Sequence, residues 1–180
     1  ARSTGAEGRA MGYLAGTYLH DSNASYAIHL LREALPKLNQ AGDLELSSLF
    51  VGKLGEALIS SGQEAEGQQL LERALRLAKQ IGYKQFERQW DILLAKRALD
   101  LGQSADAYQY LNDALPLFDA KTKANDYVKA LSLMTKTCLN LQQVKEGLGF
   151  AQQAARVAAL AAYDEHIAIR ADVTMGIVLV

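Results

Sequence analysis

The sequence repeats itself with a period of 40 residues. One column of the repeat holds alanine four times, at Ala34, Ala74, Ala114 and Ala154. A second column holds only small residues, at Ala27, Gly67, Ala107 and Gly147. A fixed period of this length is typical of stacked arrays, in which each unit buries its apolar face only against its neighbours. The chain is therefore expected to fold as four similar units in series.

The periodicity within each unit is helical. Apolar side chains return every three or four residues across 70–78, which places them on one face of a helix. Ser61 followed by Glu64 forms a capping box that would begin a second helix. Gly42 and Gly82 would end the second helices in the left-handed conformation. The unit is therefore predicted to be a helix, a turn and an antiparallel helix.

Two prolines share one column of the second helix, Pro36 in the first unit and Pro116 in the third. Proline removes a backbone donor and clashes with the preceding turn. These two helices are therefore expected to kink or end at the proline.

The small and apolar columns also follow the spacing of a known family. The first unit matches that spacing at Met11, Leu14, Ala15, Tyr18, Ala27, Leu31 and Ala34. The second unit matches it at Val51, Leu54, Gly55, Leu58, Gly67, Leu71 and Ala74. These residues resemble the tetratricopeptide repeats, and the resemblance implies an all-α fold, a right-handed superhelical solenoid of antiparallel helix pairs. Because the family's usual period is about 34, the chain is similar to the long-helix variety found in cell-polarity adaptors, kinesin light chains and the sensor regions of bacterial regulators.

The domain organisation follows from the same register. The repeats are expected at about 8–47, 48–87, 88–127 and 128–167, followed by the first helix of a fifth repeat at 168–180. Residues 1–180 would then form a single repeat domain. Because the chain begins without methionine and ends on an apolar run, we expect it to be an excerpt of a longer protein. Ile177, Val178 and Leu179 would leave an apolar helix face uncovered, which promotes self-association.

Charge and motifs argue against several classes of function. Lys and Arg total 19 and Asp and Glu total 20, so the net charge of -1 gives no overall field for nucleic acid or an anionic membrane. The single cysteine, Cys138, excludes an internal disulfide and a cysteine-rich zinc site, and we expect a buried thiol rather than a nucleophile. The phosphate-binding loop G-x-x-x-x-G-K-S/T and the zinc motif H-E-x-x-H are absent. We therefore expect no enzymatic activity, no cofactor and no bound metal ion.

The resemblance also indicates candidate binding residues. In the family the first helix of each repeat lines a concave groove, and ligand contacts concentrate at the second, fifth and ninth positions. Carried onto this chain, the candidate groove residues are Arg9, Glu56, Gln89, Lys96, Lys129, Ser132 and Lys136, with Arg88 beside them. The lysines would hold an acidic peptide through ammonium–carboxylate pairs. The alternative is that these residues are solvated and share no partner.

The ninth column departs from the family's carboxylate clamp, which has asparagine there. This chain instead carries Gly16, Glu56, Lys96 and Lys136. The departure argues against a receptor for chaperone tails and leaves the ligand unidentified.

Three glycines lie in the columns expected to line the groove. Gly12, Gly16 and Gly52 are expected to make its first half shallow. Phe50 and Trp90 share one column, and we interpret them as core residues rather than as a stacking ladder.

These features favour a non-catalytic scaffold that binds a peptide or helix of a partner protein in its concave groove. The alternative is a ligand- or peptide-sensing regulatory region of a larger signalling protein or transcription regulator, in which a bound molecule changes the superhelical pitch. Direct binding to nucleic acid or to a membrane is not expected, and the expected location is cytoplasmic.

Overall fold

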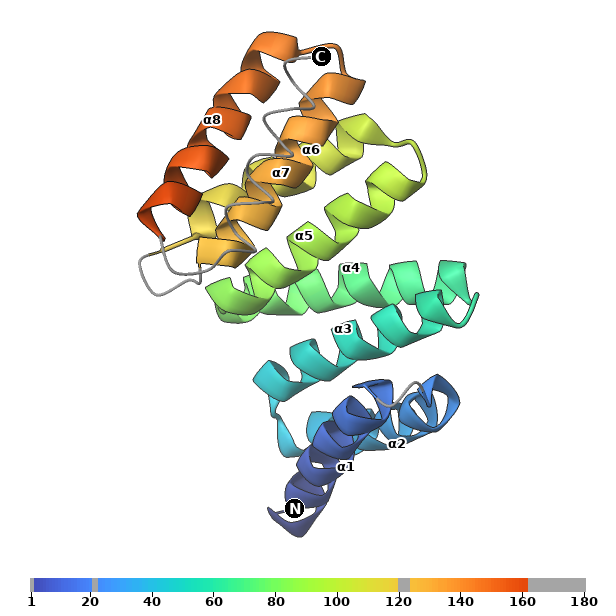
Figure 1. The fold of residues 1–180 in the computed structure, drawn as a ribbon. Helices are drawn as coiled ribbons and strands as arrows, with labels where there is room; N and C mark the ends of the chain where they lie inside the picture. Colours follow the sequence, from blue (N-terminus) through green and yellow to red (C-terminus); the bar gives the residue numbers. More distant parts are fainter. Residues whose placement is uncertain (1, 21–22, 120–123, 162–180) are drawn as a thin grey trace. The chain divides into compact units, whose positions relative to one another are not determined.

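The computed structural model describes residues 2–20, 23–119 and 124–161. These residues form eight α-helices and one short 3-10 helix, and they contain no β-strand (Figure 1). The helices are α1 (Arg2–His20), α2 (Ala24–Ala41), α3 (Leu44–Ser60), α4 (Glu64–Ile81), α5 (Lys84–Asp100), α6 (Ser104–Ala114), η1 (Leu115–Leu117), α7 (Ala124–Asn140) and α8 (Val144–Leu160). The predicted all-α fold is confirmed.

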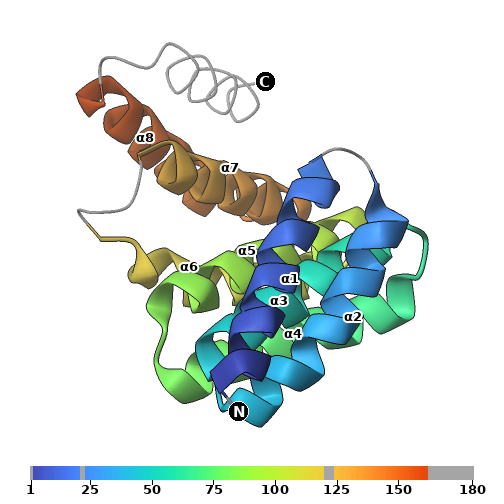
Figure 2. The same ribbon diagram turned by 90° about the horizontal axis from the view of Figure 1, so that it is seen from below.

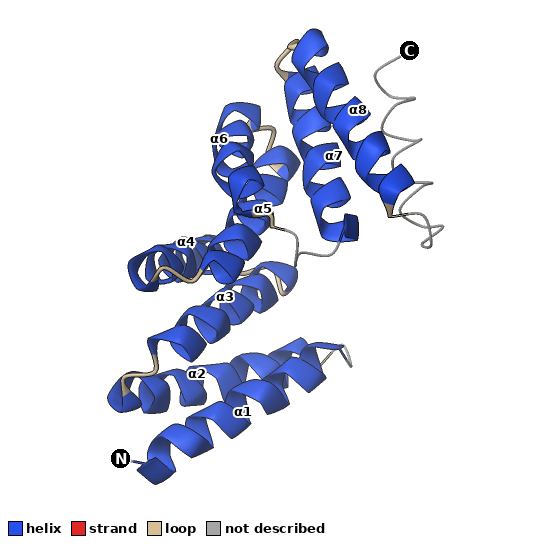
Figure 3. Cartoon of the chain, turned by 90° about the vertical axis from the view of Figure 1, so that its left-hand side faces the viewer, coloured by secondary structure: helices blue, strands red, loops and turns tan. Residues whose placement is uncertain are grey.

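The helix boundaries repeat with the period of the sequence. The first helices α3, α5 and α7 begin at residues 44, 84 and 124, and the second helices α2, α4, α6 and α8 begin at residues 24, 64, 104 and 144. The first helices thus begin before the expected repeat starts at 48, 88 and 128. Paired helices pack side by side. The pairs are α1 with α2, α3 with α4 and α7 with α8 (Figures 2 and 3).

The turns between helices agree only partly with the sequence signals. Gly42 and Gly82 end α2 and α4 with φ of 70° and 68°, as predicted. The capping box is wrong, because Ser61 closes α3 and its hydroxyl donates to the Ala57 carbonyl at 2.9 Å. The next helix takes Gln63 as its N-cap.

The two prolines have different effects. The helix α2 continues past the exposed Pro36 to Ala41, so an end at this position is not observed. In the third repeat α6 ends at Ala114, and Pro116 lies in the 3-10 helix that follows. The expected interruption is therefore confirmed in the third repeat.

The chain divides into two compact units, Ala1–Trp90 and Asp91–Val180. The core of the first unit joins α1, α2 and α3 through Ala15, Ala27, Leu31, Leu38, Leu54 and Leu58. In the second unit one cluster joins α5, α6 and α7 through Ala95, Leu99, Leu111, Met134 and Cys138, and another joins α7 and α8 through Val128, Leu131, Ala154 and Ala158. The sequence predicts one repeat domain over residues 1–180, and this stays a prediction.

Small residues stand where paired helices cross. Ala15 and Ala27 are fully buried in the first pair. In the second pair the backbones are so close that a Cβ atom on Gly67 would lie 2.6 Å from the Gly55 carbonyl oxygen. Because no side chain fits between these backbones, the small-residue columns are explained by helix packing.

The two aromatic residues of the shared column are core residues, as interpreted from the sequence. Phe50 is 3% exposed and Trp90 is fully buried. A Cβ atom on Gly12 would overlap the Phe50 ring, and one on Gly52 would overlap the Trp90 ring. The expectation that Gly12 and Gly52 make the first half of the groove shallow is therefore wrong, because an aromatic ring of the next repeat covers each glycine.

Two expectations concern residues beyond the described ranges. The fifth repeat at 168–180 and the apolar end predicted to promote self-association both lie outside the described residues. Within the described ranges, no helix combines the length and apolarity needed to cross a membrane.

Candidate ligand-binding surfaces

The ninth column of the repeat stays accessible on all four first helices. Each of its residues follows a buried small residue, in the pairs Ala15–Gly16, Gly55–Glu56, Ala95–Lys96 and Thr135–Lys136. The buried member faces the helix crossing, and the next residue is turned by about 100° around the helix axis. Gly16 and Glu56 are half-buried, whereas Lys96 and Lys136 are exposed.

The first unit has a pocket that is lined in part by two ninth-column residues, Gly16 and Glu56. Its volume is about 490 Å³, and it is lined by Gly16, Leu19, Ala24, Lys53, Glu56, Ala57 and Ser60. A Cβ atom on Gly16 would meet no heavy atom within 4 Å, so the missing side chain leaves the space open. Sequence reasoning found Gly16 and Glu56 but missed Lys53 and Ser60. Their spacing on one face of α3 beside Glu56 is the signal that could have found them.

The charged side chains of this pocket are already paired. Lys53 Nζ lies 3.0 Å from Glu56 Oε2, and the two side chains are 36% and 43% exposed. The Ser60 hydroxyl donates to the Glu56 backbone carbonyl at 3.0 Å. The pocket therefore presents one ammonium and one carboxylate side by side, with no net charge.

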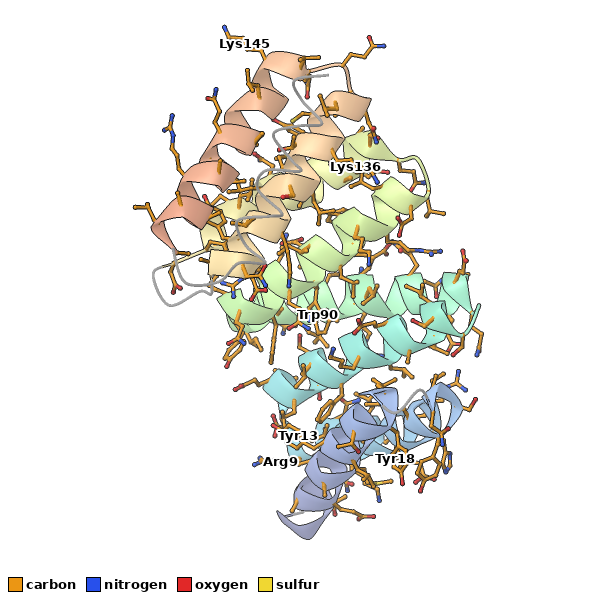
Figure 4. All side chains as sticks on the ribbon, in the orientation of Figure 1. Arg9, Tyr13, Tyr18, Trp90, Lys136 and Lys145 are labelled. Carbon is orange, nitrogen blue, oxygen red and sulfur yellow. The ribbon has the colours of Figure 1, made fainter. Side chains whose placement is uncertain are left out.

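The second unit carries two lysines at corresponding positions. Lys96 lies on α5 and Lys136 on α7, where Figure 4 labels it, and these helices share the cluster that contains Ala95 and Met134. No ion pair within the described residues holds either ammonium. The two lysines therefore present positive charge on neighbouring helices, and no carboxylate of the described residues forms an ion pair with either of them.

Two other candidate groove residues of this unit, Lys129 and Ser132, form polar contacts within α7. Lys129 Nζ lies 3.6 Å from Asp126 Oδ1. The Ser132 hydroxyl donates to the Val128 carbonyl at 2.8 Å. These local contacts compete with any contact to a ligand.

The remaining candidates lie elsewhere in the first unit. Arg9 is on α1 (Figure 4), and its Nη2 lies 2.9 Å from Asp43 Oδ2. Asp43 is also the N-cap of α3 and accepts a hydrogen bond from Leu46 N at 3.2 Å. Arg9 thus links α1 to the start of α3 and does not line the pocket. Arg88 and Gln89 are half-buried on α5, next to Trp90.

The cysteine is buried, as expected. Cys138 is fully buried on α7, and burial, with a smaller contribution from the Glu146 charge, raises its pKa to about 11. The thiol is therefore protonated at neutral pH, which disfavours nucleophilic chemistry. In the part of the chain that the structure describes, no group of three or more His, Cys, Asp or Glu side chains forms a metal site.

No protein-family model matches the sequence, and a search of the curated proteins gives no match. Among solved structures, the apo form of RapI matches with a TM-score of 0.88 and 13% identity over 98% of this chain and 49% of that chain. The quorum sensor NprR from B. thuringiensis, in its apo form, matches with a TM-score of 0.76 and 16% identity over 94% of this chain and 46% of that chain. A putative kinesin light chain with TPR-like repeats from Podosopora anserina matches with a TM-score of 0.73 and 16% identity over 94% of this chain and 84% of that chain.

The described helices, their period and these similarities agree on the fold. The chain spans about half the length of the RapI and NprR chains that it matches. At these identities the likeness concerns the fold alone. The chain has the fold of the tetratricopeptide-like helical repeat proteins.

Proposed function

We propose that the chain is a non-catalytic interaction module that holds a peptide or helix of a partner protein against its first helices. The observation that carries this proposal is the pair of exposed lysines, Lys96 and Lys136, which have no ion-pair partner within the described residues. They stand at the same position of two helices that share one core cluster. Their charge favours an acidic partner segment, because ammonium groups pair with carboxylates.

The strength of such a contact is limited by solvent. A single exposed ion pair contributes about 0.2–1 kcal/mol, so two lysines select for charge but do not bind a partner tightly alone. The rest of the affinity would come from further contacts along the first helices. A cytoplasmic location without direct binding to nucleic acid or a membrane is part of this proposal. The near-zero net charge supports the absence of charge-driven binding to nucleic acid or an anionic membrane.

A sensing role is the second candidate, and the pocket of the first unit favours it. A pocket of about 490 Å³ between α1 and α3 suits a small molecule better than a helix. The likeness to NprR, which is described as a quorum sensor, supports the same role.

The test of the first proposal is fluorescence anisotropy with a labelled peptide of alternating glutamate and alanine. The wild-type chain is compared with the Lys96→Glu/Lys136→Glu variant. We expect the variant to bind about tenfold more weakly, because two attractive contacts become repulsive. A peptide of alternating lysine and alanine is expected to bind more weakly than the acidic peptide.

A matched control reverses two charges on α8, as Lys145→Glu/Arg156→Glu. Both residues are exposed on a second helix of the same unit, and the net charge changes by the same amount. Equal losses in the two variants would mean that the peptide responds to net charge and not to the first helices. That result would refute the proposed surface.

A further inference from the structure

We propose that the pocket between α1 and α3 binds a small zwitterion of the α-amino-acid class with an apolar side chain. This inference goes beyond the peptide-binding surface and does not depend on it, because the pocket residues lie in the first unit and the two lysines lie in the second. The ligand would place its carboxylate on Lys53, its ammonium on Glu56 and its side chain toward α1.

The pocket has the space and the apolar wall that such a ligand needs. Its volume of about 490 Å³ falls within the range of about 300–1,000 Å³ that is typical of ligand pockets. Leu19 of α1 and Ala24 of α2 supply apolar surface, beside the nearly fully buried Ala57 of α3. Gly16 leaves open space where every other residue type would place a side chain. An apolar group of the ligand can therefore enter beside α1.

The ion pair selects for a ligand that carries both charges. Lys53 Nζ and Glu56 Oε2 are 3.0 Å apart, so an anion that approaches the ammonium is repelled by the carboxylate at almost the same distance. A cation that approaches Glu56 is repelled by Lys53 in the same way. A zwitterion aligned antiparallel to the pair gains both attractions at short range, and these outweigh its two like-charge repulsions, which act across the longer diagonals.

The short distance within the pair further favours an α-amino acid. In this class a single carbon atom carries both the ammonium and the carboxylate, so their separation is close to that of the Lys53–Glu56 pair. A longer zwitterion would reach only one partner at a time. The Ser60 oxygen donates its proton to the Glu56 carbonyl and keeps lone pairs that can accept from the ligand ammonium.

The test is a ¹⁵N-HSQC titration of the full chain with leucine, N-acetyl-leucine, leucinamide and doubly capped N-acetyl-leucine amide. We expect saturable shifts of α3 amides around Lys53, Glu56 and Ser60 with leucine. Each analogue that lacks one charge should bind about tenfold more weakly, since it loses one ion pair and keeps one repulsion. The capped compound should bind most weakly.

Two pairs of variants sharpen the test. Gly16→Leu fills the pocket and should abolish leucine binding, whereas Gly149→Leu, at a helical glycine of α8 that also faces open space, should leave it unchanged. Glu56→Gln removes the repulsion that anions meet, so N-acetyl-leucine should then bind better than leucinamide. Lys96→Glu/Lys136→Glu should not affect leucine binding, which separates this site from the peptide surface. Far-UV circular dichroism verifies that each variant is folded.

Three results would overturn the inference. The first is the absence of α3 shifts with leucine in the wild-type chain. The second is capped N-acetyl-leucine amide binding as tightly as leucine, because the pocket would then accept an internal peptide segment. The third is an unchanged order of the analogues in Glu56→Gln, because the ion pair would then play no part in selection.

Discussion

Replacing Gly67 by alanine tests the close packing of α3 and α4. The new Cβ atom would lie 2.6 Å from the Gly55 carbonyl oxygen and 2.6 Å from Ile59 Cγ1. A backbone carbonyl cannot turn aside, so the two helices must separate. Overpacking of this kind costs about 1–3 kcal/mol, while alanine gains about 1 kcal/mol over glycine in helix propensity. The net loss of unfolding free energy is therefore about 0–2 kcal/mol.

The matched control for this prediction is Gly16→Ala. Gly16 is also helical and lies in the same unit, but its added Cβ atom would meet open space. The control gains propensity without overpacking, so the difference between the two variants isolates the packing cost of about 1–3 kcal/mol. Urea denaturation followed by the fluorescence of Trp90, the single tryptophan, measures it in this unit. Equal stabilities of the two variants would refute the close crossing.

Three further predictions concern stability. Gln142 has φ of 61° where the equivalent Gly62 and Gly102 have φ of 83° and 75°, so Gln142→Gly should raise the unfolding free energy by up to about 1 kcal/mol in urea denaturation. Asp43→Ala removes the cap of α3 and should cost about 0.5–2 kcal/mol. Arg9→Ala removes only the ion pair with Asp43, in which the Arg9 side chain is 59% exposed, and should cost less than about 1 kcal/mol. Equal losses would contradict the capping role. Burial raises the pKa of the Cys138 thiol from 9.0 to about 11, so the unfolded chain binds fewer protons than the folded chain between pH 9 and 11. The contribution of this thiol to wild-type stability should therefore fall by up to about 1.4 kcal/mol per pH unit in that range. The Cys138→Ala variant should lose less stability between pH 9 and 11 than the wild-type chain. Identical dependence of stability on pH in the two proteins would refute the raised pKa of the thiol.

The repeated sequence columns predict much of the fold, because each column reports a local packing requirement. Small residues at Ala27 and Gly67 predict where paired helices cross, and the structure has both residues buried there. Gly42 and Gly82 predict the helix ends, because few other residues adopt the left-handed conformation without strain. The columns do not predict how closely two helices approach. The close approach of the two backbones at Gly55 and Gly67 is therefore visible only in the structure.

The candidate site is less predictable, since it depends on contacts between helices. Gly12 and Gly16 have the same sequence signal, yet Gly12 is covered by the Phe50 ring and Gly16 opens into a pocket. The difference comes from the residue that the next repeat places opposite each glycine. Arg9 matches the ligand column but pairs with Asp43, which the spacing within one repeat does not reveal.

Mapping a bound acidic peptide by ¹⁵N-HSQC tests most directly whether the first helices form the partner-binding surface. The probe is the peptide of alternating glutamate and alanine, titrated into the wild-type chain at low salt. The account predicts that the largest amide shifts cluster on α5 and α7 around Lys96 and Lys136, and that they diminish as salt is added. Shifts centred instead on Lys145 and Arg156 of α8, or spread evenly over the second unit, would contradict it.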